Sequence, residues 1–98
     1  MIYFFDIDST ICSQDTQGDY SLAKPYIDRI NKVNELYDHG HVVIFWTARG
    51  TGTGIDWRKK TKAQLKKWKV KYHDLKMSKP VFDVFVDDKA FNDKAFFD

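Results

Sequence analysis

The stretch IYFFDIDST, residues 2–10, places two aspartates directly after a run of four large apolar residues. The run is aromatic and β-branched and stops at polar residues, which is typical of a short strand buried in a sheet. Asp6 and Asp8 therefore stand where that strand ends. Two carboxylates at this position either cap a turn or carry out chemistry.

Further segments extend this pattern along the chain. Residues 42–46 (VVIFW) and 82–86 (FDVFV) each predict a strand, and a weaker pattern predicts another at residues 72–75. Apolar residues recur every three or four positions in residues 25–40 and 56–69, which predicts two helices. Pro25 suits a first helical turn, Gly40 suits a helix end and Asp56 suits an N-cap.

The alternation of strands and helices predicts one α/β domain over residues 1–98, with a parallel sheet three to four strands wide. The chain is 43% hydrophobic, which is enough to close one core. The continuous apolar strands indicate a sheet that is covered on both faces. The aromatic residues Phe91, Phe96 and Phe97 are expected to pack on this core.

Composition limits the function classes only in part. The net charge of +2 favours no class of partner. Cys12 is the only cysteine, which excludes an intramolecular disulfide and a thiolate zinc cluster and predicts a small buried side chain. The sequence has no leader-like segment and no apolar run near ~18 residues, so we expect a cytoplasmic protein that makes no contact with membranes.

Polar residues follow the predicted strands directly. Because the carboxyl ends of parallel strands lie on one edge of a sheet, we expect these polar residues to converge. They are Asp6, Asp8, Thr47, Arg49, Asp87 and Asp88. Four carboxylates close together repel one another, and a divalent cation removes that conflict. Hard oxygen ligands favour Mg²⁺, and Mg²⁺ favours phosphate substrates.

Together, four motifs resemble the haloacid dehalogenase superfamily of phosphatases. The matching segments, in the order of that family, are FDIDST (5–10), VVIFWT (42–47), Lys79 followed by Pro80, and DVFVDD (83–88). The resemblance spans nearly the whole chain and implies a three-layer Rossmann-like core. Ser9 departs from the pattern, because glycine is commoner there. Only a short flap, residues 12–24, could act as a cap, so the chain resembles a capless member.

The resemblance implies an aspartyl-phosphate mechanism that depends on Mg²⁺. Asp6 would be the nucleophile, and Asp8 would protonate the leaving oxygen and then activate water. Thr47 would hydrogen-bond the phosphoryl group, and Lys79 would neutralise charge. The implied Mg²⁺ ligands are Asp6, Asp8 through its backbone carbonyl, Asp87, and Asp88 as a direct or outer ligand. Small capless phosphatases associated with bacterial surface polysaccharides are similar, which implies a sugar phosphate as substrate.

Several alternatives stay open at this point. Arg49 is either a surface charge or, with Ala48, part of a substrate clamp. Residues 58–71 hold eight of the sixteen cations and no acid, which fits either a solvated face or attraction of a polyanion. TARGTGTG (47–54) also resembles the phosphatase half of polynucleotide kinases, so a nucleotide or nucleic-acid 3′-phosphatase is the second candidate. A homo-oligomer could shield the open site.

Three other classes fit less well. A response-regulator receiver also combines acids, Mg²⁺, Thr and Lys, but its acidic pair comes early rather than last. A metal-dependent nucleotide-sugar transferase needs a donor domain for which 98 residues leave no room. A silent regulatory subunit is disfavoured, because every core motif residue is present.

Overall fold

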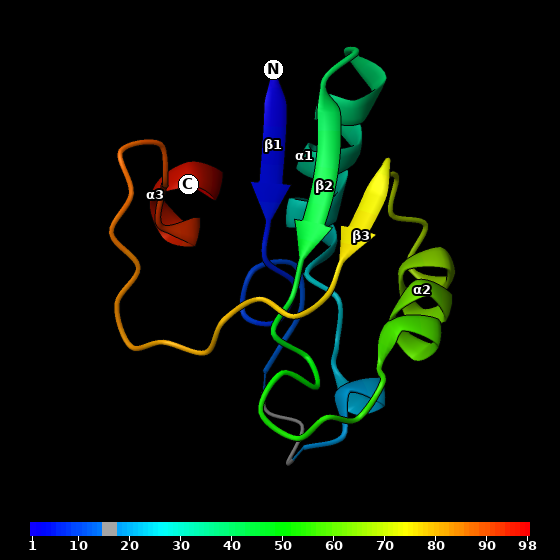
Figure 1. The fold of residues 1–98 in the computed structure, drawn as a ribbon. Coiled ribbons are helices and arrows are strands. Elements are labelled where there is room, and N and C mark those ends of the chain that lie inside the picture. The colour runs from blue at the N-terminus through cyan, green and yellow to red at the C-terminus, as the bar shows by residue number, and fades with distance from the viewer. Residues whose placement is uncertain (15–17) are drawn as a thin grey trace.

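A small parallel sheet organises the chain, and the structure, a computed structural model, describes residues 1–14 and 18–98. The elements in chain order are β1 (Ile2–Phe5), η1 (Tyr20–Leu22), α1 (Ile27–Asp38), β2 (Val42–Trp46), α2 (Arg58–Lys67), β3 (Asp74–Lys76) and α3 (Asp93–Phe97). β2 lies in the middle and pairs in parallel with β1 and with β3 (Figure 1). The predicted α/β class with a parallel sheet is confirmed.

The core lies on one face of this sheet. Phe5, Phe45 and Leu75 stand side by side in the strand register, and all three are buried. α1 adds Ile30 and Val33 to this cluster, and α2 adds Leu65. These helical residues belong to the apolar stripes that the sequence pattern predicts. The N-cap of α2 is Trp57 and not Asp56, so the predicted cap is displaced by one residue, although the Asp56 carboxylate accepts the backbone N–H of Arg58 at 3.0 Å.

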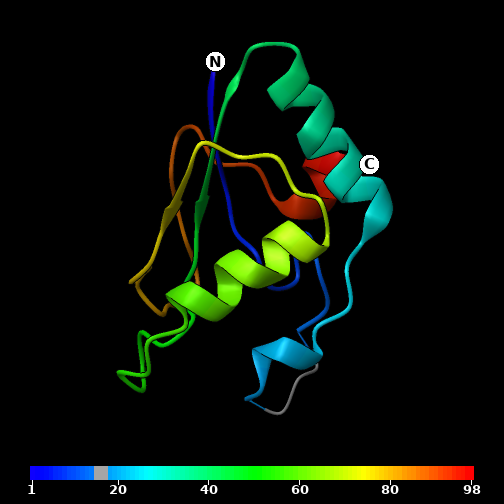
Figure 2. The same ribbon diagram turned by 90° about the vertical axis from the view of Figure 1, so that its right-hand side faces the viewer.

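The opposite face of the sheet is largely bare in the described part of the chain. Ile2 is 68% exposed and Phe4 is 54% exposed. Figure 2 shows α1, α2 and α3 on the same side of the strands. The strand order advances in one direction, and right-handed crossovers that advance in one direction place their helices on one face. Within the described residues the expected third layer is absent, and the sheet and the helices on one of its faces form two layers.

The sequence pattern predicts no helix at α3, although it predicts that the aromatic residues of this segment pack on the core. The rings of Phe96 and Phe97 lie 5.6 and 6.0 Å from the ring of Phe5. Arg29 of α1 pairs with Asp93 of α3 at 2.7 Å, which ties the end of the chain to the core. Phe91 does not pack into the core as expected, because its side chain is 74% exposed.

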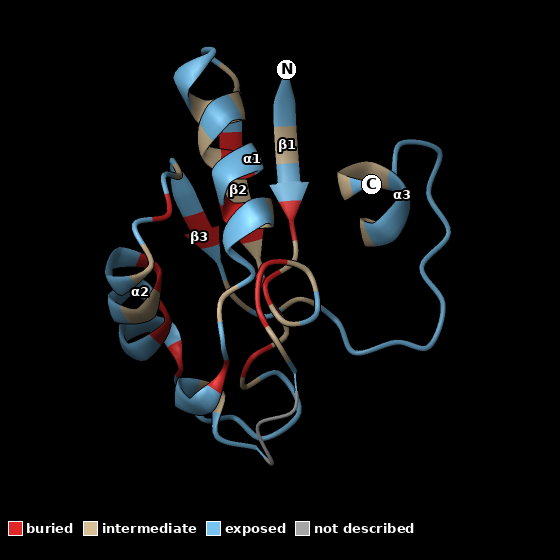
Figure 3. Ribbon diagram, turned by 180° about the vertical axis from the view of Figure 1, so that it is seen from behind, coloured by how far each residue is buried: buried red, intermediate tan, exposed pale blue. Residues whose placement is uncertain are grey.

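Residues 82–86 form no strand in the structure, so that prediction is wrong. The segment is exposed (Figure 3), with Val84 at 77% and Val86 at 91% exposure. The backbone N–H of Lys79 donates to the carbonyl of Thr47 at 3.0 Å, which fixes Lys79 at the carboxyl edge. A strand parallel to β1 would have to start at the opposite side of the sheet, where β1 begins. The chain needs about a dozen residues or more to make such a parallel crossover. Two residues separate Lys79 from Phe82.

None of the helices in the described residues combines the length and apolar character that crossing a bilayer requires.

The strand predicted at residues 72–75 is present but shifted along the chain, since β3 spans Asp74–Lys76. It lies beside the end of β2, where Phe45 pairs with Leu75. The carboxyl ends of β1, β2 and β3 consequently meet at one edge, and this edge holds the candidate site.

Candidate functional site

The turn after β1 sets the positions of both aspartates. The backbone N–H groups of Thr10 and Ile11 donate to the carbonyl of Ile7 at 3.1 and 2.9 Å. Ser9 closes the turn by donating its N–H to the carbonyl of Cys12 at 2.8 Å. Its φ of 64° lies in the left-handed region, which favours glycine. This backbone conformation gives a physical reason why glycine suits the position and shows that serine carries local strain there.

The end of β2 positions Thr47 and Lys79 beside the end of β1. Thr47 donates its N–H to the carbonyl of Lys76 at 3.0 Å, and the Thr51 hydroxyl donates to the carbonyl of Lys79 at 2.9 Å. Lys79 Nζ lies 3.9 Å from Asp6 Oδ1. The structure thus brings Asp6, Thr47 and Lys79 to neighbouring strand ends. The Thr47 side chain is enclosed, and its hydroxyl oxygen accepts the N–H of residue 49 at 3.2 Å.

Asp6 is the more accessible carboxylate of the pair, and 40% of its side chain is exposed. Its partial burial raises its pKa above the ordinary value, because the charged form loses hydration. The ammonium group of Lys79 opposes this effect and pulls the pKa of Asp6 downward. Desolvation is the stronger of the two effects. A desolvated carboxylate with one cation in reach is a reasonable nucleophile.

Asp8 is held by Arg49. Arg49 Nη2 donates to Asp8 Oδ1 at 2.8 Å, and Arg49 Nε donates to Asp8 Oδ2 at 3.0 Å. The two side chains are only 1% and 12% exposed, respectively. Arg49 is therefore an interior residue and not the surface charge that one interpretation predicted. Ala48 lies in the same turn, where its carbonyl accepts the N–H of Thr51 at 2.9 Å.

Sequence reasoning missed the partners of Arg49. α2 supplies Thr61 and Gln64, and η1 supplies the ring of Tyr20. The available signal was Thr61, a polar residue within the apolar stripe of α2. Cys12 behaves as predicted: it is buried, and burial together with the nearby Asp8 charge raises its thiol pKa to about 12. A thiol with that pKa stays protonated and is a poor nucleophile.

Asp87 and Asp88 do not join this cluster in the structure. Both are exposed on the segment that follows Lys79, and Asp87 accepts the backbone N–H of Lys89 at 2.7 Å. Among the described residues, no three Asp, Glu, His or Cys side chains stand where they could share one metal ion. Both oxygens of Asp8 are also occupied by Arg49. The carboxylates as arranged here do not fit the expected Mg²⁺ site. Residues 15–17 of the predicted flap lie outside the described residues.

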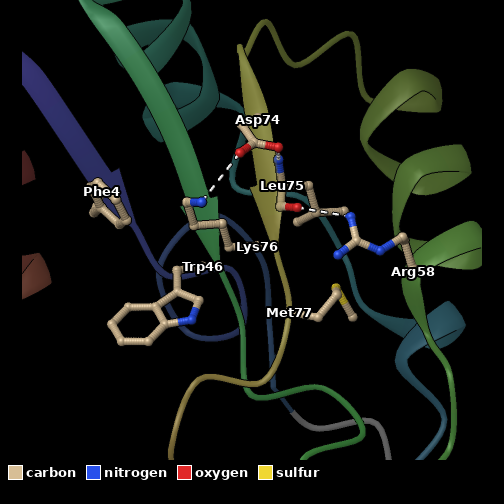
Figure 4. A pocket seen from close by; sticks show the side chains of 7 residues that line it. All are labelled: Phe4, Trp46, Arg58, Asp74, Leu75, Lys76 and Met77. Atoms are coloured by element: carbon tan, nitrogen blue, oxygen red, sulfur yellow. Dashed lines mark hydrogen bonds and ion pairs between the residues drawn. The ribbon is translucent and has the colours of Figure 1, made fainter.

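A groove of about 460 Å³ opens on the bare face of the sheet, next to this edge (Figure 4). Its lining residues are Phe4, Trp46, Arg58, Asp74, Leu75, Lys76 and Met77. The rings of Phe4 and Trp46 meet edge to face at 6.3 Å. Lys79 Nζ lies 5.9 Å from the centre of the Trp46 ring, so one ammonium group faces both the groove and Asp6.

The fold and this edge define a small Rossmann-like α/β protein. A crystal structure of a structural-genomics target from Vibrio cholerae is similar, with a TM-score of 0.89 and 24% sequence identity over 98% of this chain and 86% of that chain. No protein-family model matches the chain. A search of curated proteins also finds no match. The similarity is one of fold.

Proposed function

We propose that this chain is a phosphomonoester hydrolase in which Asp6 is the nucleophile. The observation that carries the proposal is the pairing of a partly desolvated Asp6 with Lys79, 3.9 Å away at the carboxyl edge of a parallel sheet. This edge is where open α/β sheets bind their ligands. Asp8 follows two residues later, so two carboxylates with different surroundings are available for two chemical roles.

The proposed reaction has two steps. An oxygen of Asp6 attacks phosphorus, a new O–P bond forms, and the bond from phosphorus to the leaving oxygen breaks. Asp8, which Arg49 pairs as a carboxylate, takes up the proton carried by a phosphate monoester monoanion and passes it to that leaving oxygen. Asp8 then takes a proton from water, which attacks the aspartyl phosphate, releases inorganic phosphate and restores Asp6. Lys79 offsets the negative charge that Asp6 and the phosphoryl group share, and the Thr47 hydroxyl is the proposed donor to a phosphoryl oxygen.

Mg²⁺ belongs to the proposal as the cofactor that the family resemblance implies. When bound, it would offset negative charge between the carboxylates and the phosphoryl group. The structure does not gather its expected ligands, because Asp87 and Asp88 lie on an exposed segment. The two steps above are therefore derived from the side chains of Asp6, Asp8, Thr47 and Lys79 alone.

The test is the hydrolysis of p-nitrophenyl phosphate by three samples: the native chain with Mg²⁺, the native chain with EDTA, and Asp6→Asn with Mg²⁺. Asp83→Asn, which removes an exposed carboxylate that no proposed step uses, is the matched control. We expect turnover in the first sample and in the control only. Equal rates in Asp6→Asn and the native chain would overturn the role of Asp6, and undiminished turnover in EDTA would overturn the role of Mg²⁺.

The first candidate substrate is a small phosphorylated metabolite, such as a sugar phosphate, because the sequence resembles small capless phosphatases associated with bacterial surface polysaccharides. The groove beside Lys79 favours the second candidate, a nucleotide or nucleic-acid 3′-phosphate. Aromatic rings on a sheet face stack with bases, and cations attract phosphates. Phe4 and Trp46 provide the rings, while Arg58 and Lys76 provide the charge.

A substrate comparison separates these two candidates. A panel of sugar phosphates and a short 3′-phosphorylated oligonucleotide are assayed with the native chain and with Trp46→Leu. If the groove binds a base, the variant should lose turnover on the oligonucleotide by about tenfold, as expected when one base loses its stacking partner, and keep its sugar phosphate rates. Equal rates on the oligonucleotide for both proteins would remove the second candidate.

A further inference from the structure

We infer that Arg49 is a positioning residue that holds the carboxylate of Asp8 in place for proton transfer, an inference that rests on the function proposed above. The guanidinium group presents a rigid fork of five N–H donors. Two parallel hydrogen bonds from this fork to both oxygens of Asp8, at 2.8 and 3.0 Å, fix the plane and the direction of that carboxylate.

The remaining donors of Arg49 are also engaged. Nη1 donates to Thr61 Oγ1 at 3.2 Å and to Gln64 Oε1 at 2.7 Å. The second N–H of Nη2 faces Cys12 Sγ at 3.9 Å. Every direction in which the guanidinium can donate is thus taken up by the protein. An arginine in this state has no free donor with which to bind a phosphate.

The flat side of the guanidinium is supported as well. The centre of the Tyr20 ring lies 4.8 Å from Arg49 Cζ, and the ring of Trp57 packs edge-on against Tyr20 at 4.9 Å. Gln64 joins the two elements, because its Nε2 donates to the carbonyl of Tyr20 at 2.8 Å. The position of Asp8 therefore depends on α2 and η1 as well as on the turn after β1 that carries it.

The engagement of its donors distinguishes this role from a substrate clamp. The side chain of Arg49 is 1% exposed, whereas that of Lys79 is 18% exposed. A substrate that reaches Lys79 and Asp6 finds no free donor on Arg49, because the protein already takes up its N–H groups. Loss of Arg49 should consequently lower kcat, because Asp8 would no longer meet the leaving oxygen, and leave KM almost unchanged.

Arg49→Lys is the principal variant, because lysine keeps the charge and removes the planar fork. Its kcat and KM are measured with phenyl phosphate, a poor leaving group, and with p-nitrophenyl phosphate, a good one. General acid catalysis contributes about 10²–10⁴-fold, so we expect kcat to fall by about 100-fold on phenyl phosphate. The loss on p-nitrophenyl phosphate should be smaller, because its leaving oxygen needs the proton less. A rise in KM with kcat retained would identify a substrate clamp and overturn the inference.

Chemical rescue of kcat distinguishes a positioning role from a merely structural one, because added guanidinium would not restore kcat if Arg49 only stabilised the fold. In Arg49→Ala, added guanidinium at millimolar concentration should restore part of kcat, and ammonium at equal ionic strength should not. Equal effects of the two salts would contradict the positioning role. Thermal unfolding of each variant is followed by circular dichroism, so that a folding defect is seen separately from a loss of chemistry.

Gln64→Met keeps the test decisive should the Arg49 variants unfold. This variant retains both Arg49 and Asp8 and removes one partner that orients the fork, so we expect kcat to fall severalfold at constant KM. Lys62→Gln, on the exposed side of the same helix, is the control and should match the native chain. An unchanged kcat in folded Gln64→Met would overturn the inference.

Asp6→Asn in the same assays separates this inference from the proposed function. If Asp6→Asn is inactive while Arg49→Lys keeps its kcat on phenyl phosphate, the positioning role alone is wrong. If Asp6→Asn turns over like the native chain, the proposed function itself fails. Inactive Asp6→Asn together with the leaving-group dependence of Arg49→Lys supports both.

Discussion

Asp6 and Asp8 flank the buried Ile7, and yet their surroundings in the fold differ. Asp6 is partly exposed, and its nearest charged partner is the Lys79 ammonium at 3.9 Å. Asp8 is nearly buried and is bound at both oxygens by Arg49. The difference teaches that a short acidic motif can supply two separate chemical groups. An accessible carboxylate can attack, and a fixed carboxylate can transfer a proton in a defined direction.

The largest expected effect concerns activity at Asp6. Asp6→Asn should lower p-nitrophenyl phosphate turnover by at least about 10⁴-fold, because the amide cannot attack phosphorus, and loss of a nucleophile is among the most severe active-site changes. Steady-state rates measured beside Asp83→Asn check this. A loss of less than tenfold would mean that the accessible aspartate is not the nucleophile.

The next effect concerns stability at Asp8. Asp8→Asn leaves the Arg49 guanidinium buried without its counter-charge, which should lower the free energy of unfolding by about 3 kcal/mol. The double variant Asp8→Asn Arg49→Met should recover most of that loss, because no buried charge is left unpaired. Urea unfolding of the single and double variants measures both values. A double variant no more stable than Asp8→Asn would contradict the view that an unpaired Arg49 causes the loss.

Ser9 gives a smaller effect in the turn that carries both aspartates. Its φ of 64° suits glycine, so Ser9→Gly should relieve strain and raise the free energy of unfolding by about 0.5 kcal/mol after the entropy of the unfolded chain is included. Ser9→Val should lower it by about 1–2 kcal/mol, because a β-branched side chain fits that region poorly. The same unfolding assay ranks all three proteins. A less stable glycine variant would show that the Ser9 hydroxyl bond to Gln14, at 2.6 Å, outweighs the strain.

The smallest effect is a pH dependence at Asp6. Burial raises its pKa, so the folded chain holds the proton more tightly than the unfolded chain. Stability should fall as pH rises from the ordinary value of 3.8 through the raised value, and it should stay lower above that window. Asp6→Asn cannot ionise and should melt about 2 °C higher than the native chain at pH 7 without added metal.

Thermal unfolding from pH 3 to pH 7 tests this sign. The difference between Asp6→Asn and the native chain should vanish below pH 3.8, where both side chains are neutral. A native chain that is more stable than Asp6→Asn at pH 7 would mean that attraction to Lys79 outweighs desolvation.

Much of the fold could be predicted from local pattern, and the reason is physical. Ile2–Phe5 and Val42–Trp46 are strands, and residues 27–38 and 58–67 are helices, because each periodic pattern matches one buried face. The meeting of Asp6 and Thr47 also followed, since the ends of parallel strands share an edge, whereas Lys79 was expected beside them from the family resemblance.

The remainder depended on the path of the chain through space. The run at residues 82–86 is apolar enough for a strand, but no local pattern reports that Lys79, three residues before its start, is fixed at the edge where parallel strands end. The same limit applies to the bare face, which follows from strand order and crossover handedness. The interior position of Arg49 depended on Thr61 and Gln64, which come from a helix that begins nine residues later.

The most direct test of the central claim is chemical trapping of the intermediate during turnover of p-nitrophenyl phosphate. The reaction is quenched, and borohydride converts an aspartyl phosphate into homoserine, which mass spectrometry locates in the sequence. The account predicts homoserine at position 6 in the native chain and none in Asp6→Asn. Product formation with homoserine at another aspartate, or with no reduced aspartate at all, would contradict it.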